Sequence, residues 1–237
     1  MFRLRSAALT DIGKIRRRNE DRFVCDDSLR LYGVADGIGG LPGGAEAAQI
    51  TVDTLREHLR DRTPPDLAAA VHAANAAVLG RAATVSPHVG MGSTLTAALF
   101  QDAALTLAHV GDSRAYRWRA GQLTALTRDH SVENEAHDRG DTESLHWMTE
   151  ANRHALTRCI GQPPPLTVDE THQALAPGDR YLFATDGISR VLGDSALAAA
   201  LAADAAPDDL LQRLIQLGLR RGAPDNATAV LVFIDEL

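Results

Sequence analysis

Short connections between apolar segments constrain the fold of this chain more than any other feature. Four such segments follow one another between residues 94 and 126, and only a few residues, among them Gln101-Asp102 and Ala120-Gly121, separate each from the next. Connections this short join antiparallel neighbours, because a parallel crossover needs about a dozen residues or more. The sequence therefore predicts antiparallel strands over 94–100, 104–110, 115–118 and 123–126.

The rest of the chain alternates between helix-forming and strand-forming patterns. The polar, weakly periodic stretch 131–153 predicts a flap-like surface excursion. We predict a single α+β domain spanning 1–237, with antiparallel sheets. Apolar residues at helical spacing predict helices over 46–60 and 67–78, joined by a turn at Pro64-Pro65, and later over 195–203 and 208–219. Further apolar runs predict strands over 31–35, 180–185 and 227–234.

The charge balance and the cysteines limit the class of partner. The 237-residue chain has a formal net charge of −7, which argues against a nucleic acid or an acidic membrane surface, because both attract clustered Lys and Arg. Cys25 and Cys159 lie far apart, so neither a disulfide framework nor a zinc site is indicated. A reducing cytoplasm fits these two cysteines best, and no apolar run is as long as a membrane span, so we expect a cytoplasmic protein with no membrane partner.

Aspartates recur at the ends of the predicted strands. Asp36, Asp112 and Asp186 each follow an apolar run, and Asp225 precedes the last predicted strand. A turn explains each one taken singly, since Asp-Gly pairs commonly form turns. As a set they indicate a shared site, because antiparallel sheets can bring strand ends together. Carboxylates that close repel one another unless cations neutralise them.

These strand ends offer only oxygen ligands, which favours Mg²⁺ or Mn²⁺ and disfavours zinc. Two such ions suit the hydrolysis of a phosphate ester, since they acidify a bridging water and offset charge on the phosphoryl oxygens. Gly37, Gly39 and Gly40 would let backbone carbonyls and a bulky substrate approach the ions. On spacing alone this reaction class is one hypothesis among others.

A basic run near the N-terminus supplies candidates for a phosphate clamp. Arg16, Arg17 and Arg18 stand just before Glu20 and Asp21, and an arginine fork can bind two phosphate oxygens at once. A solvated basic turn paired with these acids explains the same residues equally well. The local pattern leaves both interpretations open.

Seven short motifs follow one another along the chain. They are Asp11-x-Gly13-x-x-Arg16-x-x-Asn19-Glu20-Asp21, Val34-Ala35-Asp36-Gly37-Ile38-Gly39-Gly40, Gly90-Met91-Gly92-Ser93-Thr94, His109-Val110-Gly111-Asp112-Ser113-Arg114, Leu126-Thr127-x-Asp129-His130-Ser131, Ala184-Thr185-Asp186-Gly187 and Asp225-Asn226-x-Thr228. Any one of them is weak evidence. In this order, and over about residues 11–233, they resemble the metal-dependent Ser/Thr protein phosphatases (the PPM, or type 2C, family) in their compact bacterial form.

The resemblance implies a fold of two packed antiparallel sheets flanked by helix pairs, with a metal centre in a cleft at one edge of the sandwich. It implies two Mn²⁺ or Mg²⁺ ions. Asp36 would bridge both ions, the Gly37 carbonyl would bind one of them, and Asp186 and Asp225 would hold the other. Asp112, together with Asp186, would match a weaker third-metal site.

Four further residues take roles from the same resemblance. Arg16 stands where the family places its phosphate-binding arginine. Glu20 and Asp21 would order metal-bound waters, and Asn226, next to the ligand Asp225, would support the centre without binding metal. Arg16, Asp36 and Asp186 are therefore the predicted catalytic set.

The sequence departs from the family pattern in two places. Ile38 stands where many eukaryotic members carry a histidine proposed as general acid, so the leaving alcohol must take its proton from elsewhere. His109 and His130 are alternatives, although a lone histidine beside a strand is more often structural. The second departure is the excursion 132–152, whose residues match no pattern that would define a substrate.

The leading hypothesis is an enzyme that hydrolyses phosphoserine and phosphothreonine on proteins, opposing a bacterial Ser/Thr kinase, and acting as a monomer. A catalytically silent phosphoprotein-binding module on the same fold is the alternative, but it should have lost Asp36, Asp186 or Asp225, and all three are present. An unrelated metal-dependent esterase or nuclease is a third interpretation, and the net charge of −7 opposes a nuclease. A phosphatase restricted to one switch protein stays open.

Overall fold

The computed structural model describes residues 2–60 and 65–237. Its strands form two sheets of five strands each, and every pairing between neighbouring strands is antiparallel. The first sheet has the order β1 (Arg3–Asp11), β10 (Ala227–Glu236), β9 (Arg180–Ala184), β6 (Arg114–Arg119) and β7 (Gln122–Ala125). The second has the order β2 (Arg22–Asp26), β3 (Leu31–Ala35), β4 (Leu95–Gln101), β5 (Ala104–Val110) and β8 (Asp169–Ala174).

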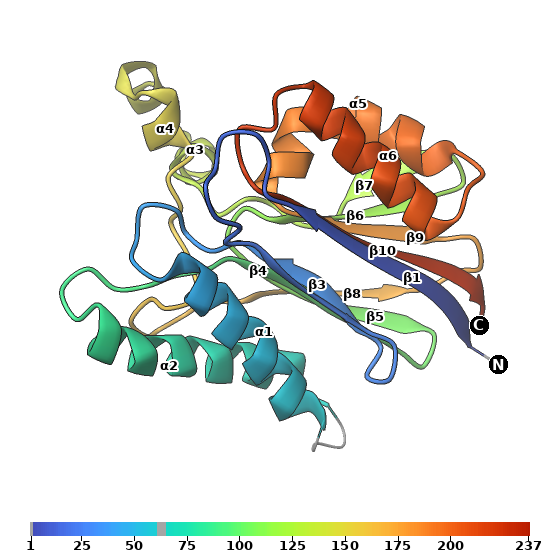
Figure 1. The fold of residues 1–237 in the computed structure, drawn as a ribbon, viewed down its shortest axis with the longest axis horizontal. Helices are drawn as coiled ribbons and strands as arrows, with labels where there is room; N and C mark the ends of the chain where they lie inside the picture. Colours follow the sequence, from blue (N-terminus) through green and yellow to red (C-terminus); the bar gives the residue numbers. More distant parts are fainter. Residues whose placement is uncertain (1, 61–64) are drawn as a thin grey trace.

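A pair of helices covers the outer face of each sheet, as Figure 1 shows. Helices α1 (Gly44–Arg60) and α2 (Leu67–Val85) pack on the second sheet, and α5 (Asp186–Ala202) and α6 (Pro207–Arg220) pack on the first. A third apolar layer lies between the sheets, where Phe100 meets the rings of Tyr32 and Tyr181 edge-on at 5.5 and 5.3 Å. The predicted α-β-β-α sandwich is confirmed.

The sequence did not predict strands β1, β2 and β8 or the first half of α5. Strands β1, β2 and β8 lie at sheet edges. The strand end at Asp186-Gly187, where no helix was predicted, begins α5, which kinks at Gly193 (φ 68°) before the predicted segment 195–203. An acidic residue in the first turn of a helix is favourable, because it faces the positive end of the helix dipole. The predicted turn at Pro64-Pro65 falls partly outside the described residues.

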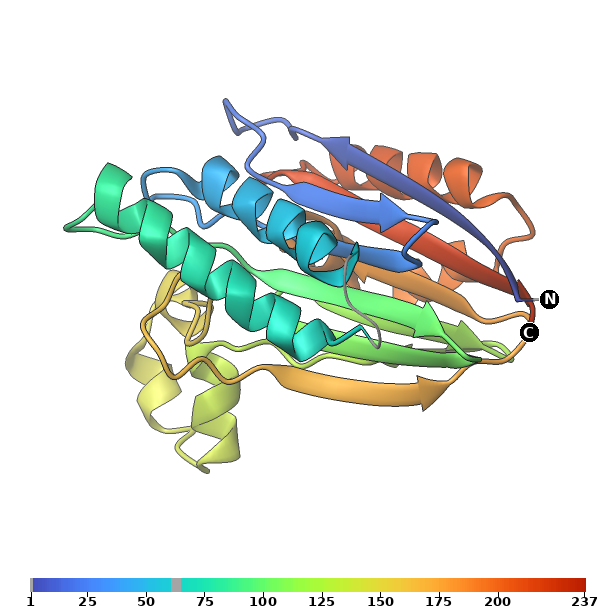
Figure 2. The same cartoon turned by 90° about the horizontal axis from the view of Figure 1, so that it is seen from below.

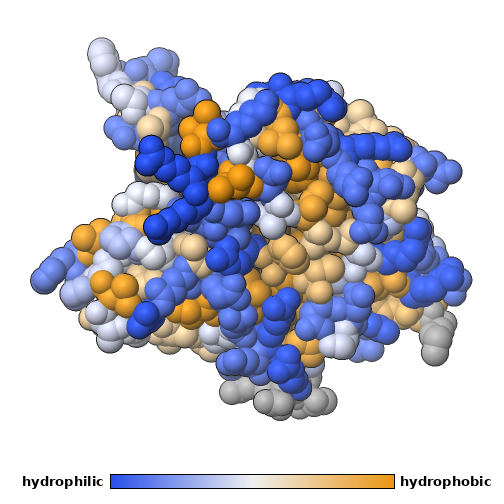
Figure 3. Space-filling view, in the orientation of Figure 1, coloured by the Kyte–Doolittle hydropathy of each residue, from blue (hydrophilic) through white to orange (hydrophobic). Residues whose placement is uncertain are grey.

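The predicted excursion stands apart from the sandwich as a small helical flap, seen in yellow in Figures 1 and 2. It contains α3 (Val132–Asp138), a 3₁₀ turn (Ser144–Trp147) and α4 (Glu150–Arg153). Figure 3 shows hydrophilic side chains over much of the face seen there and the flap projecting beyond the body. Within the described residues, no helix is both long and apolar enough to cross a membrane.

Candidate metal centre and phosphate site

One cleft gathers most of the residues that the sequence analysis singled out. It has a volume of about 440 Å³. Asp36 follows β3, Asp112 follows β5, Asp186 begins α5 directly after β9, and Asp225 precedes β10. Antiparallel pairing places these four strand ends at one edge of the sandwich. The predicted residues that line the cleft are Arg16, Glu20, Asp36, Gly37, Asp112, Asp186, Asp225 and Asn226.

The backbone at Asp36 is fixed by the neighbouring segment 93–94. Asp36 donates its N–H to the Thr94 hydroxyl (2.9 Å), and its carbonyl accepts from the Thr94 N–H (2.8 Å) and the Ser93 hydroxyl (3.0 Å). A Cβ on Gly37 would overlap the backbone of Gly44. The carboxylate of Asp36 therefore leaves a rigid strand end, and glycine is required beside it.

Asn226 joins the N-terminal loop to the start of β10. Its side-chain NH₂ donates to the carbonyls of Ile12 (2.9 Å) and Arg18 (3.0 Å), and its side-chain oxygen accepts from the Glu20 N–H (2.8 Å). These bonds bracket Arg16 on both sides. The guanidinium of Arg16 is thereby held beside Asp225, to which it donates across 2.6 Å.

Gly39 lies directly beside the Arg16 guanidinium. A Cβ at this position would come within 2.8 Å of the Arg16 Nη1 atom. Gly40 needs glycine for a different reason, since its φ is +88° and a Cβ there would meet nothing within 4 Å. Gly37 thus makes room for the backbone of Gly44, Gly39 makes room for the Arg16 guanidinium, and Gly40 permits the positive φ.

Asp21 does not line the cleft but lies buried beneath it, with 2 % of its surface exposed. It accepts a hydrogen bond from the Thr185 hydroxyl at 2.9 Å. Thr185 in turn accepts from the Thr228 N–H at 3.1 Å. Asp21 therefore ties the loop that carries Arg16 to the strand ends beside Asp186 and Asp225.

The cleft concentrates negative charge in a poorly hydrated place. Burial raises the pKa of Asp36 well above its usual range, and the carboxylates of Asp21, Asp186 and Asp112 raise it further. Burial and the neighbouring Asp186 raise the pKa of Asp112 to about 7. Burial also raises the pKa of Asp186, against the opposing effect of Arg190. Such shifts are typical of carboxylates crowded together in a poorly hydrated site, where positive charge favours the ionised form.

The donor set fits divalent cations that keep most of their water. In the part of the chain that the structure describes, no three His, Cys, Asp or Glu side chains gather closely enough to enclose one ion. Mg²⁺, however, usually binds through one or two carboxylates and retains several waters. The Asp186 Oδ1 atom is buried and lacks a hydrogen-bond partner. An orphaned carboxylate oxygen at the cleft is the donor that a hydrated cation needs.

The two histidines considered as proton donors are structural. His109 is 2 % exposed, and its ring nitrogens lie 2.8 Å from the Thr96 hydroxyl and 3.0 Å from the Arg128 carbonyl oxygen. His130 accepts from the Gly111 N–H and pairs with Asp169 at 3.1 Å. Neither His109 nor His130 lines the cleft. The structure therefore assigns neither of them to the cleft.

The cleft residues that come from the flap and from α5 were not predicted from the sequence. Ala151, His154 and Leu156 line the cleft at the end of the flap, and no motif marks them. Arg190 also lines it, reaching Asp112 at 2.6 Å and Asp186 at 3.3 Å. The spacing of four residues between Asp186 and Arg190 is the signal that could have revealed this pair on a helix.

Two stacked antiparallel sheets with an acidic cleft and one arginine at its rim are suited to metal-dependent hydrolysis of phosphate esters. The model of a known family, described as protein phosphatase 2C, matches residues 16–230. The chain belongs to this family, and the resemblance stated from its motifs is confirmed.

Similar proteins in bacteria are named as protein phosphatases. The serine/threonine protein phosphatase PstP of Mycobacterium tuberculosis is 36% identical over 236 residues, which cover 96% of this chain and 44% of that protein. The chain thus spans less than half of the length of that relative. A putative protein phosphatase 2C-type of Streptococcus pyogenes is 31% identical over 235 residues and covers 94% of both chains.

Solved structures share the fold over the full chain. The crystal structure of the PstP phosphatase of Mycobacterium tuberculosis matches with a TM-score of 0.87 at 35% identity and covers 100% of both chains. The catalytic domain of PstP in complex with two manganese ions matches with a TM-score of 0.85, also at 35% identity and with 100% of both chains covered.

Proposed function

We propose that this chain is a metal-dependent protein serine/threonine phosphatase that uses two Mn²⁺ or Mg²⁺ ions to hydrolyse phosphoserine and phosphothreonine. The convergence of Asp36, Asp186 and Asp225 with Arg16 in one cleft is the observation that carries the proposal. The manganese-bound PstP domain and the names of the bacterial relatives support the choice of metal and substrate class.

We assign the metal ligands to the strand ends. Asp36 would bridge the two ions, the Gly37 carbonyl would bind one of them, and Asp186 and Asp225 would hold the other. The orphaned Asp186 Oδ1 supports this assignment. When bound, the ions would supply a water acidified into a nucleophile and would offset the charge of the phosphoryl group.

The other cleft residues act on the substrate or on the ligands. Arg16 would bind the phosphoryl oxygens, and its place beside Gly39 and Asp225 leaves a two-pronged donor at the rim of the cleft. Glu20 faces the cleft and can accept hydrogen bonds from ordered waters. Asp21 and Asn226 hold the Arg16 loop against β10, so we assign them positioning roles.

We extend the proposal to the domain organisation, substrates, location and oligomeric state of the protein. We infer that residues 1–237 form a single catalytic domain, supported by the apolar layer shared by the two sheets. We infer that phosphorylated proteins are its substrates and that a cognate bacterial Ser/Thr kinase is its functional opponent. A cytoplasmic monomer is the expected form. A silent phosphoprotein-binding module is disfavoured, because every predicted metal-binding aspartate is present at the cleft.

Hydrolysis of a phosphothreonine peptide tests this proposal. The purified chain is assayed with Mn²⁺, with Mg²⁺ and with a chelator, beside Asp36→Asn and Asp186→Asn. We expect activity that needs metal and is lost in both variants. Asp53→Asn, which removes an exposed carboxylate on α1 outside the cleft, is the matched control and should remain active. A folded protein that is inactive with every metal would instead support a binding module.

A further inference from the structure

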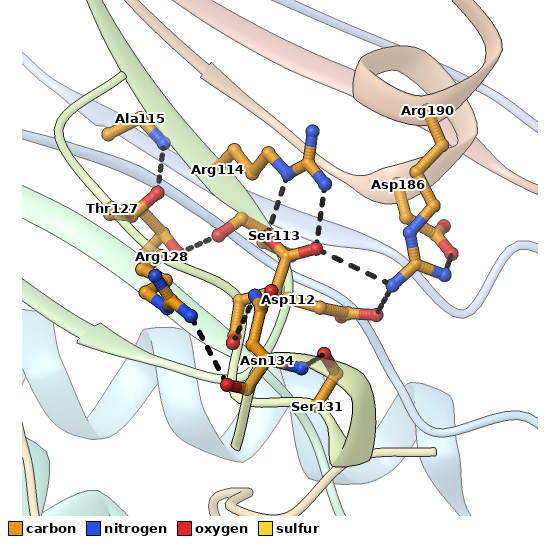
Figure 4. A network of polar contacts seen from close by, with 12 residues as sticks. Asp112, Ser113, Arg114, Ala115, Thr127, Arg128, Ser131, Asn134, Asp186 and Arg190 are labelled. Atoms are coloured by element: carbon orange, nitrogen blue, oxygen red, sulfur yellow. Dashed lines mark hydrogen bonds and ion pairs between the residues drawn. The ribbon is translucent and has the colours of Figure 1, made fainter. Parts of the chain in front are cut away.

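Arg190 occupies the position where the sequence analysis expected a third metal ion. The predicted ligands of that ion are Asp112 and Asp186. The Arg190 Nη2 atom lies 2.6 Å from Asp112 Oδ2, and its Nη1 atom lies 3.3 Å from Asp186 Oδ2. Figure 4 shows the guanidinium lying between the two carboxylates. One side chain of this protein therefore already binds both predicted ligands.

A third carboxylate completes the surroundings of Arg190. Asp129 Oδ2 lies 3.7 Å from Arg190 Nη2. Asp129 is itself held by two hydrogen bonds from Arg114, at 2.7 and 2.8 Å. The side chain of Asp129 is 8 % exposed and that of Arg190 is 26 % exposed. Arg114 therefore fixes the Asp129 carboxylate, and Arg190 lies close to that same carboxylate.

The buried carboxylate of Asp112 has a positive partner without a metal ion. Asp112 is 6 % exposed, and a carboxylate this buried needs a positive partner close by. Arg190 supplies that partner at hydrogen-bonding distance. A divalent cation between Asp112 and Asp186 would have to displace a guanidinium of the same sign of charge. The residues present therefore do not fit a third ion, in contrast to the two-ion centre at Asp36.

The two carboxylate oxygens of Asp186 have different surroundings. Its Oδ2 atom accepts from Arg190, whereas its Oδ1 atom is buried without a partner. Because Asp186 and Arg190 are four residues apart on α5, the helix itself fixes their separation. Arg190 thus orients the free oxygen of Asp186 and leaves it available to the two-ion centre.

We propose that Arg190 supplies an internal positive charge in place of a third metal ion, so that this chain binds two divalent cations and no more. Arg190 is a positioning residue for Asp186 and the counter-ion of Asp112. The inference rests on the proposed function, because it takes the two-ion centre as given. Beyond that function, Arg190 blocks the weaker metal site at Asp112.

Counting bound Mn²⁺ ions by equilibrium dialysis tests the inference without an activity assay. We expect two ions per wild-type chain. Arg190→Met keeps an apolar stem but removes the charge, and it should bind one additional ion. That additional ion should be lost again in the double variant Arg190→Met/Asp112→Asn. Arg190→Lys, which keeps a cation at the site, should bind two. Arg213→Met, on the exposed face of α6, is the matched control and should also bind two.

The possible results separate this inference from the proposed function. Three ions in the wild-type chain would overturn the role of Arg190, whether or not any variant folds. A folded Arg190→Met variant that still binds two ions would also overturn it. A wild-type chain that binds no Mn²⁺ would refute the metal centre itself, and with it the basis of the inference. Circular dichroism on each variant establishes that the ions are counted on folded protein.

Discussion

Arg16 and Asp225 form an ion pair across 2.6 Å, although 209 residues separate them in the sequence. The pair joins the expected phosphate-binding side chain to an expected metal ligand. Arg16 extends from a loop that Asn226, the neighbour of Asp225, holds in place. In the proposed centre, binding of phosphate and binding of metal would therefore be linked through one short segment.

Replacement of this arginine should weaken substrate binding more than metal binding. We expect Arg16→Ala to raise the KM for a phosphothreonine peptide roughly tenfold, because hydrogen bonds to charged groups contribute about 1.5–3 kcal/mol. Arg16→Lys should recover only part of this loss, since an ammonium lacks the fork geometry. Steady-state kinetics at saturating Mn²⁺ measures the effect, with Arg213→Ala as a control. An unchanged KM would remove Arg16 from the phosphate site.

Gly187 should be intolerant of any side chain. It follows Asp186 in the first turn of α5, and a Cβ there would overlap the carbonyl oxygen of Asn226. We expect Gly187→Ala to lower the free energy of unfolding by about 1–3 kcal/mol, the usual cost of overpacking. It should also raise the Mn²⁺ concentration needed for half-maximal activity, because Asn226 adjoins Asp225.

Gly80 provides a contrasting glycine for the same measurement. It lies inside α2, and a Cβ there would meet nothing within 4 Å. Gly80→Ala should therefore raise the free energy of unfolding by about 0.4–1 kcal/mol, because it reduces the freedom of the unfolded chain. Urea denaturation of both variants provides the comparison. Equal effects of the two substitutions would show that the space around Gly187 can relax.

The predictability of each strand depended on where it lies in its sheet. The strands β3, β4, β5, β9 and β10 are largely buried and appear in the sequence as apolar runs. The strands β1, β2 and β8 lie at sheet edges and carry polar or mixed sequences, such as Asp169–Ala174. Edge strands keep polar side chains because one side of the strand faces water. Apolar periodicity does not reveal these three strands, whereas the fourth edge strand, β7, was predicted because the short turn at Ala120-Gly121 joins it to β6.

The same limit explains what was missed in the candidate site. Asp36, Asp186 and Asp225 stand at the ends of buried strands, so the pattern that revealed the strands also revealed them. Arg190 was hidden because Asp186-Gly187 indicated a turn, which concealed the helical spacing between Asp186 and Arg190. The cleft residues of the flap depend on how a polar segment packs, and the sequence carries no period for that contact.

The buried Thr185 hydroxyl should contribute measurably to stability. It donates to Asp21 and accepts from the Thr228 N–H. Thr185→Val keeps the shape but removes both bonds, which leaves a buried carboxylate oxygen unpaired and should cost about 1–3 kcal/mol. Thr185→Ser keeps the hydroxyl and should cost less. Urea denaturation in the presence of a chelator measures both, and a Thr185→Val variant as stable as the wild type would show that the hydroxyl does not contribute.

His109 should make the fold less stable in mild acid. Burial, together with the neighbouring His130, whose ring centroid lies 4.6 Å away, lowers the pKa of His109 to about 4. An unfolded histidine has a pKa of about 6.5. Between these two values the unfolded chain binds a proton that the folded chain does not, so the free energy of unfolding falls as the pH falls.

The size and the source of this effect can be measured with one variant. A pKa difference of this size corresponds to at most about 3 kcal/mol, lost progressively from about pH 6.5 to pH 4. His109→Gln cannot take up the proton, so its free energy of unfolding should depend less on pH over this range. Chelator in all samples keeps metal binding out of the comparison, and the difference between wild type and variant cancels the titration of the cleft carboxylates. Parallel pH profiles for the two proteins would mean that His109 is protonated equally in the folded and unfolded chains.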